Sequence, residues 1–412
     1  CLVEEPQTGE NAGLRSYRND LDPRLPTSDL FCYNAWVMHR IDGILARCLE
    51  LPLIEPWETS QRRATTSPTV IVELRAGGIT GYGEATPVRY VTGEDVNSVI
   101  HDVTAAAQAL EGAMLSEYRL SSAKLAEVLP YGKSARAGIE MAIFDAFCKS
   151  LGIPLFRYLG GASLRIETDV TIPITSPERA REKAQECAAR GFRHFKIKAG
   201  KDREEDIARV LAINDGAPRC SFIIDPNQGF TPTQAVTFTR DLLERGIRVR
   251  LLEQPVDAAD LDGMRYVTNH VPVPVFADEA AQTPADVLEI IRYKAATGVN
   301  DKIMKAGMVG SLEIKSICRA AGLELMFGCM LESRIAQSAA VHIGCGTNAF
   351  SVFDLDSDLL LAEQPVTGGL VRRGPFLRVL NRPGLGCEIA EGAFETFGGR
   401  DPRDIAEQSS TE

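Results

Sequence analysis

Several features that define common protein classes are absent from this chain of 412 residues. No apolar run approaches the roughly 18–20 residues that a membrane-spanning helix needs. The formal net charge is −11, whereas a nucleic-acid-binding protein usually presents a basic face. Neither a G-x-G-x-x-G fingerprint nor a P-loop follows any strand-like run. These absences predict a protein with neither a membrane nor a nucleic-acid partner.

Cysteine and histidine are present, but not in the spacings of disulfide, zinc or nucleophilic sites. None of the ten cysteines forms a C-x-x-C pair, and most fall inside apolar helical or strand patterns. Free buried thiols in a reducing compartment are therefore expected, and the cytoplasm is the predicted location. Because the chain begins with Cys1 rather than methionine, a preceding segment with any targeting signal is expected to be missing. The five histidines form no Ser-His-Asp or Cys-His arrangement.

A change of pattern after Gly160-Gly161 divides the chain into two main parts. Before it, alternating apolar runs around Ala76-Gly77-Gly78 predict a β-hairpin, and helical patterns follow over 93–112, 119–129 and 134–151. An α+β domain is therefore expected in the first part. The predicted segments are an N-terminal extension, 1–36, this α+β domain, 37–160, a β/α domain, 161–371, and a C-terminal segment that returns to the first domain, 372–412.

The second part alternates eight short apolar strand patterns with helices. Such alternation predicts a parallel β/α barrel, and a doubly wound open sheet is the alternative. The barrel is favoured because functional-looking residues end nearly every strand, whereas an open sheet concentrates them at one switch point. The predicted strands are 167–174, 193–198, 220–225, 248–253, 274–278, 298–302, 323–328 and 349–354.

Three consecutive strands of this barrel end in a carboxylate. Asp225, Glu253 and Asp278 each follow an apolar run, and they are 28 and 25 residues apart. Neighbouring strands lie about 4.8 Å apart, so acids at their carboxyl ends can converge on one cation. Three oxygen ligands without a nearby histidine or cysteine favour Mg²⁺, or else Mn²⁺, over zinc, with one ion per subunit. The alternative is that each acid caps the helix after its strand.

Lysines end the second and the sixth strands. The period of two places Lys196 and Lys198 on the barrel interior, which is unfavourable unless the site pairs or uses them. Lys302 ends the sixth strand, diametrically opposite in an eight-stranded barrel, so Lys198 and Lys302 are expected to face each other across the metal. Nearby cations are expected to lower the pKa of such a lysine towards that of a working base. The alternative is that Lys302 lies in a solvated loop.

Two further acids end the eighth strand. Asp354 and Asp356 share the period of two, so both are expected to face the pocket. They have no basic neighbour in the sequence, and a substrate cation, most simply an ammonium group, is their expected partner.

These residues together resemble the enolase superfamily, specifically its muconate-lactonizing subgroup, over roughly residues 37–395. The matching set comprises the Lys-x-Lys of strand two, the acids of strands three to five and the lysine of strand six. The resemblance implies an α/β fold, a modified TIM (β/α) barrel with an N-terminal α+β capping domain completed by the C-terminal segment. It also implies Mg²⁺ binding by the three acids and assembly into a homo-oligomer.

Within this subgroup, Asp354-Leu355-Asp356 is similar to the motif with which dipeptide epimerases bind the substrate α-ammonium group. The resemblance also places Thr171, Lys196 and the backbone around Cys329 and Leu331 against the substrate. It matches Arg62 to a cap arginine that binds the side-chain carboxylate of Ala-Glu dipeptides, although an arginine in this polar loop can also simply be solvated.

The resemblance therefore implies a Mg²⁺-dependent epimerase that inverts the α-carbon of the C-terminal residue of a dipeptide, most simply L-Ala-D/L-Glu or a related one. Lys198 and Lys302 are the expected bases of a 1,1-proton transfer, and Lys196 is expected to stabilise the oxyanion. The alternatives in the same subgroup are o-succinylbenzoate synthesis and cycloisomerisation. A non-catalytic barrel that binds a metal and a small acid is the alternative from another class.

Overall fold

The computed structural model describes residues 39–60 and 63–397 of the chain. The predicted N-terminal extension, 1–36, and Arg62, the predicted ligand of an acidic side chain, lie outside these ranges. Within the described ranges, no helix is long and apolar enough to cross a membrane.

The first part of the chain forms an antiparallel sheet with helices on it, called the cap below. The sheet has the order β1-β2-β3, and Ala76 pairs with Ile79 across the predicted Gly77-Gly78 turn. Both glycines have positive φ, as a tight hairpin turn requires. The predicted hairpin and the three predicted helices are confirmed. The elements are β1 (Ile41–Glu58), β2 (Arg63–Ala76), β3 (Ile79–Ala85), α2 (Arg89–Thr92), α3 (Val96–Leu110), α4 (Tyr118–Val128), α5 (Lys133–Ser150) and α6 (Leu155–Tyr158).

The second part forms one parallel sheet of eight strands in the described part of the chain, in the sequential order β5 to β12. The sequential order confirms the predicted barrel, and the doubly wound alternative is wrong because that fold reverses its strand order. Each strand lies inside its predicted range. The strands are β5 (Val170–Ile172), β6 (His194–Lys198), β7 (Ser221–Asp225), β8 (Val249–Glu253), β9 (Val275–Ala277), β10 (Gly298–Asp301), β11 (Glu324–Gly328) and β12 (Val352–Asp354).

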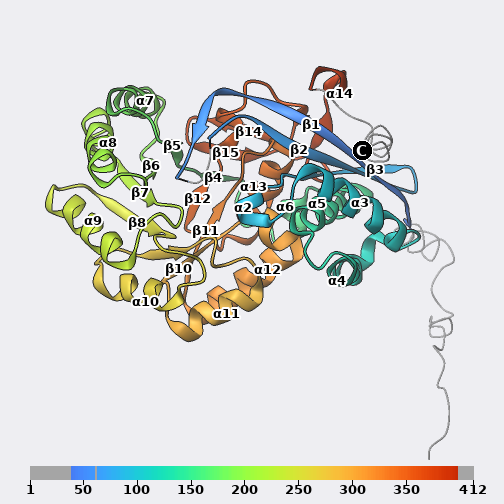
Figure 1. The fold of residues 1–412 in the computed structure, drawn as a ribbon. Coiled ribbons are helices and arrows are strands. Elements are labelled where there is room, and N and C mark those ends of the chain that lie inside the picture. Colours follow the sequence, from blue (N-terminus) through green and yellow to red (C-terminus); the bar gives the residue numbers. More distant parts are fainter. Residues whose placement is uncertain (1–38, 61–62, 398–412) are drawn as a thin grey trace, which may run out of the picture. The chain divides into compact units, whose positions relative to one another are not determined.

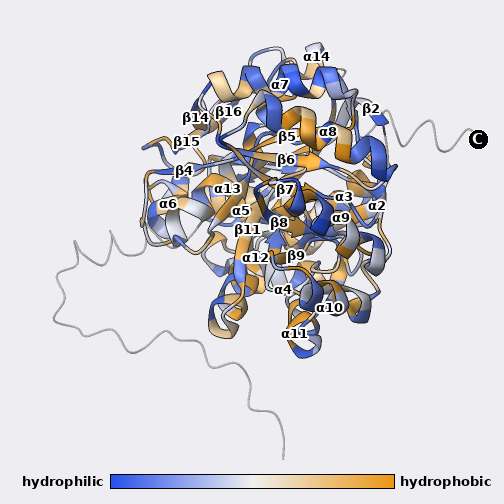
Figure 2. Cartoon of the chain, turned by 90° about the vertical axis from the view of Figure 1, so that its left-hand side faces the viewer, coloured by the Kyte–Doolittle hydropathy of each residue, from blue (hydrophilic) through white to orange (hydrophobic). Residues whose placement is uncertain are grey.

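Helices follow the barrel strands and surround them (Figure 1). Those labelled α10 and α11 combine hydrophilic and hydrophobic residues in Figure 2, as expected for helices with one face against a sheet. The helices are α7 (Pro177–Ala189), α8 (Arg203–Gly216), α9 (Pro232–Glu244), α10 (Leu261–His270), α11 (Pro284–Tyr293), α12 (Ile303–Ala321) and α13 (Arg334–Thr347).

The barrel is nearly closed between its first and last strands, where side-chain hydrogen bonds supplement a backbone hydrogen bond. The Asp169 N–H donates to the Phe353 carbonyl at 3.0 Å. The Thr168 hydroxyl donates to the same carbonyl at 3.2 Å and accepts from the Leu355 N–H at 2.8 Å. These bonds bring the end of β12 next to the start of β5, so the acids after β12 lie beside Thr171.

The barrel interior has an apolar lower layer and a charged upper layer. The period of two carries four of the five inward apolar residues to an inward acid two positions later. Asp225, Glu253, Asp278 and Asp354 follow four residues of the lower layer at this spacing. The buried lower layer consists of Ile223, Leu251, Phe276, Met326 and Val352.

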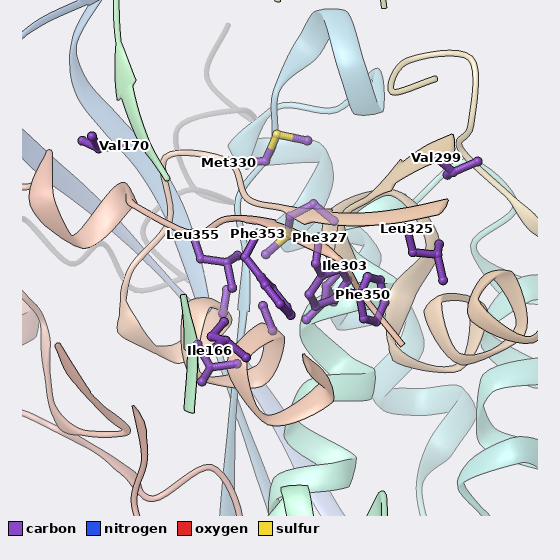
Figure 3. Close-up of a cluster of buried hydrophobic side chains, with 14 of the residues drawn as sticks. Ile166, Val170, Val299, Ile303, Leu325, Phe327, Met330, Phe350, Phe353 and Leu355 are labelled. Carbon is purple, nitrogen blue, oxygen red and sulfur yellow. The ribbon is translucent and has the colours of Figure 1, made fainter. Parts of the chain in front are cut away.

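The last strands are held from outside by a buried aromatic cluster (Figure 3). The rings of Phe327 and Phe350 lie 4.6 Å apart, and those of Phe350 and Phe353 lie 6.1 Å apart. Ile166 joins this cluster from a small sheet at the end of the barrel domain. That sheet contains β4 (Arg165–Glu167), β14 (Leu370–Arg373) and β15 (Phe376–Val379), and the nearby β13 (Val366–Gly368) pairs with β16 (Cys387–Ile389).

Candidate active site

A pocket of about 570 Å³ lies between the cap and the carboxyl ends of the barrel strands. Eight residues that the sequence singled out line it, and they come from β5, β6 and the loops after β10, β11 and β12. They are Thr171, Lys196, Lys198, Lys302, Cys329, Leu331, Asp354 and Asp356.

The end of β1 is fixed over this pocket by ion pairs between the cap and the barrel. Glu55 accepts from Arg179 and from Lys183, both at 2.6 Å, and both of these side chains come from α7. Glu58 accepts from Lys201 after β6, also at 2.6 Å. Single exposed pairs contribute little, but a network of several charges fixes the position of a strand end better than one pair does.

The three predicted metal-binding acids lie together at the top of the barrel. Asp225, Glu253 and Asp278 are at most 1% exposed, and they end or directly follow β7, β8 and β9. The helix-capping alternative is wrong, since other side chains cap the helices that follow. The N-caps of α9, α10 and α11 are Thr231, Asp260 and Thr283.

The two lysines of β6 lie against these acids. The Nζ of Lys196 lies 2.8 Å from Glu253, 2.7 Å from Asp354 and 3.1 Å from Asp225. The Nζ of Lys198 lies 2.6 Å from Asp225 Oδ2. Lys196 therefore links the acids of the predicted metal site to the acids after β12.

Two lysines approach from the opposite side of the barrel. Lys302, which follows β10, places its Nζ 2.6 Å from Asp278 Oδ2. Lys305 donates to Asp278 Oδ1 at 2.7 Å and to the Asn300 carbonyl at 2.7 Å. Both lysines are buried, so the alternative of a solvated loop cation is wrong. Because β6 and β10 are the second and sixth of eight strands, Lys198 and Lys302 belong to opposite walls.

The carboxylates dominate the protonation of these lysines. Burial acts against the charge of Lys302, but the adjacent Asp278 carboxylate outweighs it and raises the pKa of Lys302 above its usual value. Burial also acts against the charge of Lys196, but the nearby carboxylates, Asp354 first, outweigh it and raise the pKa of Lys196. In the protein by itself, acids that contact these two lysines directly therefore raise their pKa, and the lowering expected beside a bound metal ion stays a prediction.

One of the acids ionises less readily than an isolated carboxyl group. Burial, and then repulsion by Asp225, raises the pKa of Glu253 to about 8. Burial would also raise the pKa of Asp225, but Lys198 and Lys196 hold it at about 2. Of the two oxygens of Glu253, Oε2 has no hydrogen-bond partner among the described residues. The site therefore favours additional positive charge next to Glu253.

The composition of this cluster fits a divalent cation. Buried carboxylates outnumber the buried lysines in this cluster, so negative charge is in surplus where they are ionised. As the described side chains stand, no three acid, histidine or cysteine groups are placed to share one ion, because ammonium groups contact the acids instead. Donor type and charge nevertheless suit Mg²⁺, with Asp225, Glu253 and Asp278 as the residues to hold it. The carboxylates are Asp225, Glu253, Asp278, Glu279, Asp354 and Asp356, and the lysines are Lys196, Lys198, Lys302 and Lys305.

The acids after β12 face Thr171. The Thr171 N–H donates to Asp356 Oδ2 at 2.6 Å, and its hydroxyl donates to Asp354 Oδ1 at 3.2 Å. Neither acid has a basic neighbour in the sequence, but the fold pairs Asp354 with Lys196. Burial and then the Asp354 charge raise the pKa of Asp356 to about 6, and no lysine or arginine of the described chain forms an ion pair with it. Asp356 is the acid best placed to accept a cation from outside.

Cap side chains position the loop after β11, which the sequence reasoning missed. The Ser67 hydroxyl donates to the Leu331 carbonyl at 2.6 Å. Glu84, at the end of β3, accepts from the Ser333 N–H at 2.8 Å and from the Ala336 N–H at 3.1 Å. A charged residue ending an apolar strand is the signal that could have singled out Glu84.

The cap side of the pocket is largely apolar, and Trp57, Val88 and Val91 were not singled out from the sequence. Trp57, Val88, Tyr90 and Val91 line it together with Thr59. They carry no pattern that the sequence alone connects to the barrel, because they come from two separate segments of the cap.

Family models match both parts of the chain. The N-terminal domain of the mandelate racemase/muconate lactonizing enzymes matches residues 44–160, and an enolase C-terminal domain-like model matches residues 179–393. The chain belongs to the mandelate racemase/muconate lactonizing family of the enolase superfamily. The predicted resemblance is thereby confirmed.

Relatives in this family include characterised epimerases. An L-Ala-D/L-amino acid epimerase of Populus trichocarpa is 36% identical over 82% of each chain. An L-Ala-D/L-Glu epimerase of Bacillus subtilis is 34% identical over 82% of this chain and 94% of that protein. The structure of an Enterococcus faecalis dipeptide epimerase, complexed with Mg and L-Leu-L-Tyr, is 32% identical, with a TM-score of 0.82 over 85% of this chain and 99% of that one. This member of the family is an isomerase of the epimerase type.

Proposed function

We propose that the protein is a Mg²⁺-dependent dipeptide epimerase that inverts the α-carbon of the C-terminal residue by proton transfer between two lysines. The observation that carries the proposal is the placement of Lys198 and Lys302 on opposite walls, on either side of the buried acids. A group bound between opposed bases can lose a proton to one face and regain one on the other.

In the proposed reaction, Nζ of one lysine takes the α-proton, and the C–H electron pair moves into the substrate carboxylate. The other lysine, as an ammonium, returns a proton to the opposite face, and the two lysines exchange roles for the reverse reaction. Bound Mg²⁺ would supply positive charge next to the carboxylate oxygens that gain charge. Lys196, in contact with Glu253 and Asp354, contributes a further fixed positive charge on the same side.

The proposed substrate follows from the acids after β12. Asp354 and Asp356 suit the α-ammonium group of a peptide, whereas o-succinylbenzoate synthesis and cycloisomerisation need no such site. The names of the relatives support a dipeptide. L-Ala-D/L-Glu is the first substrate to examine, with Arg62 as the proposed partner of an acidic second side chain.

The proposal is tested by incubating the protein with Mg²⁺ and a panel of dipeptides in D₂O, Ala-Glu first, and following the α-protons by NMR. Exchange of the C-terminal α-proton, accompanied by the second diastereomer, is expected. N-acetylated dipeptides, which lack the ammonium group, are the control and are expected to react slowly. Absence of exchange with every dipeptide refutes the proposal and favours a binding protein.

Asp356→Asn is the variant that separates dipeptide epimerisation from the related activities. Asp354→Asn would be less clear, because it also removes an ion-pair partner from Lys196. Asparagine at position 356 can still accept from the Thr171 N–H, so only the charge is lost. Loss of epimerase activity in Asp356→Asn with an unchanged fold supports an ammonium site, and unchanged activity contradicts it.

Two further proposals concern the setting of the enzyme. The eight cysteines in the described ranges are free thiols, which suits a reducing compartment such as the cytoplasm. A homo-oligomer is also proposed, and the molar mass from light scattering tests it directly.

A further inference from the structure

A second cavity adjoins the active-site pocket on the side of the acids after β12. It has a volume of about 810 Å³ and lies between β5, α7 and the end of β1. We call it the side pocket. Trp57, Thr171 and Leu360 line both cavities, so these three residues form the partition between them.

The partition lies next to the acids that suit an ammonium group. Thr171 donates its N–H to Asp356 and its hydroxyl to Asp354. In a dipeptide, the side chain of the first residue leaves from the same carbon that bears the ammonium group. If these acids hold the ammonium group, the first carbon of that side chain lies about two bonds from the ammonium nitrogen, beside the partition.

The wall of the side pocket nearest the partition is apolar. Ile172, Pro173 and Leu359 line it, and Cys187 of α7 also lines the side pocket. Apolar walls with few polar groups are typical of sites that take apolar ligand groups. They suit an extended hydrocarbon side chain better than the methyl group of alanine, which cannot reach past the partition.

The charged rim of the side pocket is partly neutralised by its own ion pairs. Arg179 and Lys183 both lie 2.6 Å from Glu55 across the gap between cap and barrel. These cations already have a carboxylate partner, so the rim offers little to a second charged group. The chemistry of the pocket therefore favours an uncharged side chain.

We propose that the side pocket receives the side chain of the first residue of the substrate, and that the enzyme favours first residues of leucine to phenylalanine size over alanine and glycine. This inference rests on the proposed function and specifies its substrate class. Cys187 is a specificity-determining residue in this proposal, because a larger side chain at this lining position would reduce the space in the side pocket.

The first test uses the unaltered protein and a series of dipeptides with glycine, alanine, leucine and phenylalanine as the first residue. The second residue is the one that exchanges fastest in the D₂O panel. kcat/KM is expected to rise about tenfold or more from glycine to leucine, the usual range for filling an apolar pocket. A fall in kcat/KM from alanine to leucine overturns the proposal while epimerisation of alanine dipeptides still supports the proposed function. No exchange with any dipeptide refutes both.

The second test narrows the pocket without touching the active site. Cys187→Phe is expected to lower kcat/KM for the leucine dipeptide about tenfold and to change that for the alanine dipeptide by less than about threefold. Gln185→Phe, at an exposed position of the same helix that does not line the side pocket, is the matched control and is expected to change neither. An equal loss for both dipeptides, or no loss for the leucine dipeptide, contradicts the proposal. If Cys187→Phe does not fold, the dipeptide series decides.

Discussion

Replacing Gly328 by alanine would place a methyl group between two functional side chains. A Cβ at this position, the end of β11, would lie 2.7 Å from Asn300 Oδ1 and 2.9 Å from Lys302 Cε. Neither neighbour can move freely. Asn300 donates to Glu253 at 2.8 Å, and Lys302 lies 2.6 Å from Asp278.

Contacts this short force one of the two side chains to shift. Overpacking of a buried site costs about 1–3 kcal/mol of the free energy of unfolding. A displacement of about 1 Å in a reacting group costs on the order of 10²-fold in rate. We therefore expect Gly328→Ala to fold, to lose about 1–3 kcal/mol of stability and to lose between about tenfold and 10²-fold in kcat, with a smaller effect on KM.

The measurements are kcat and KM for the best dipeptide, and the free energy of unfolding from denaturant titration. Gly43→Ala is the matched control, since a Cβ at Gly43 in strand β1 meets no atom within 4 Å. The control is expected to retain wild-type activity. Wild-type kcat in Gly328→Ala would show that Lys302 does not need the position that the structure gives it.

Four further predictions follow from the site and the core. Lys198→Ala and Lys302→Ala are each expected to abolish epimerisation. In D₂O, each variant should still exchange the α-proton of one substrate stereoisomer, and the two variants should act on opposite stereoisomers. Full-rate epimerisation by either variant contradicts the two-base mechanism. Asp356→Asn is expected to raise KM about tenfold to 10²-fold, because one charged hydrogen bond to the substrate is lost. Initial-rate kinetics measures this change in KM. EDTA is expected to remove activity, and added Mg²⁺ is expected to restore it. Calorimetry should find weaker Mg²⁺ binding in Glu253→Gln than in the unaltered protein. Equal Mg²⁺ affinity of the two proteins contradicts the assignment of Glu253 as a metal ligand. Burial lowers the pKa of His342 from 6.5 to about 4, so the unfolded chain takes up the proton first as the pH falls. The free energy of unfolding should then decrease from about pH 6.5 and lose about 3 kcal/mol of this contribution near pH 4, whereas His342→Asn should show a flatter denaturation profile.

The strand pattern of the barrel was predictable because it is local. Each strand lies in its predicted range, since a short apolar run bounded by turns carries its own signal. The parity of side chains along a strand is equally local. It predicts that Lys196 and Lys198 share a face, and both contact the acids inside the barrel.

The partners of these side chains were less predictable. Lys196 was expected near the metal acids, but its shortest ion pair is with Asp354, 158 residues along the chain. The pairing arises because near-closure of the barrel brings β12 next to β5 and so towards β6. It also raises the pKa of Lys196, since a lysine among several acids keeps its proton.

The sequence by itself determined the order of strands, the inward positions and the types of charged groups at the top of the barrel, because periodicity and composition are properties of short segments. Only the tertiary structure decided which acids pair with which lysines, that Glu84 of the cap positions the loop after β11, and that a side pocket adjoins Thr171. Several of these contacts join segments far apart in the chain, such as Lys196 with Asp354 and Glu84 with Ser333, separated by 158 and 249 residues. Their contacts are set by how the barrel closes and how the cap packs on it, and no local pattern encodes those distances.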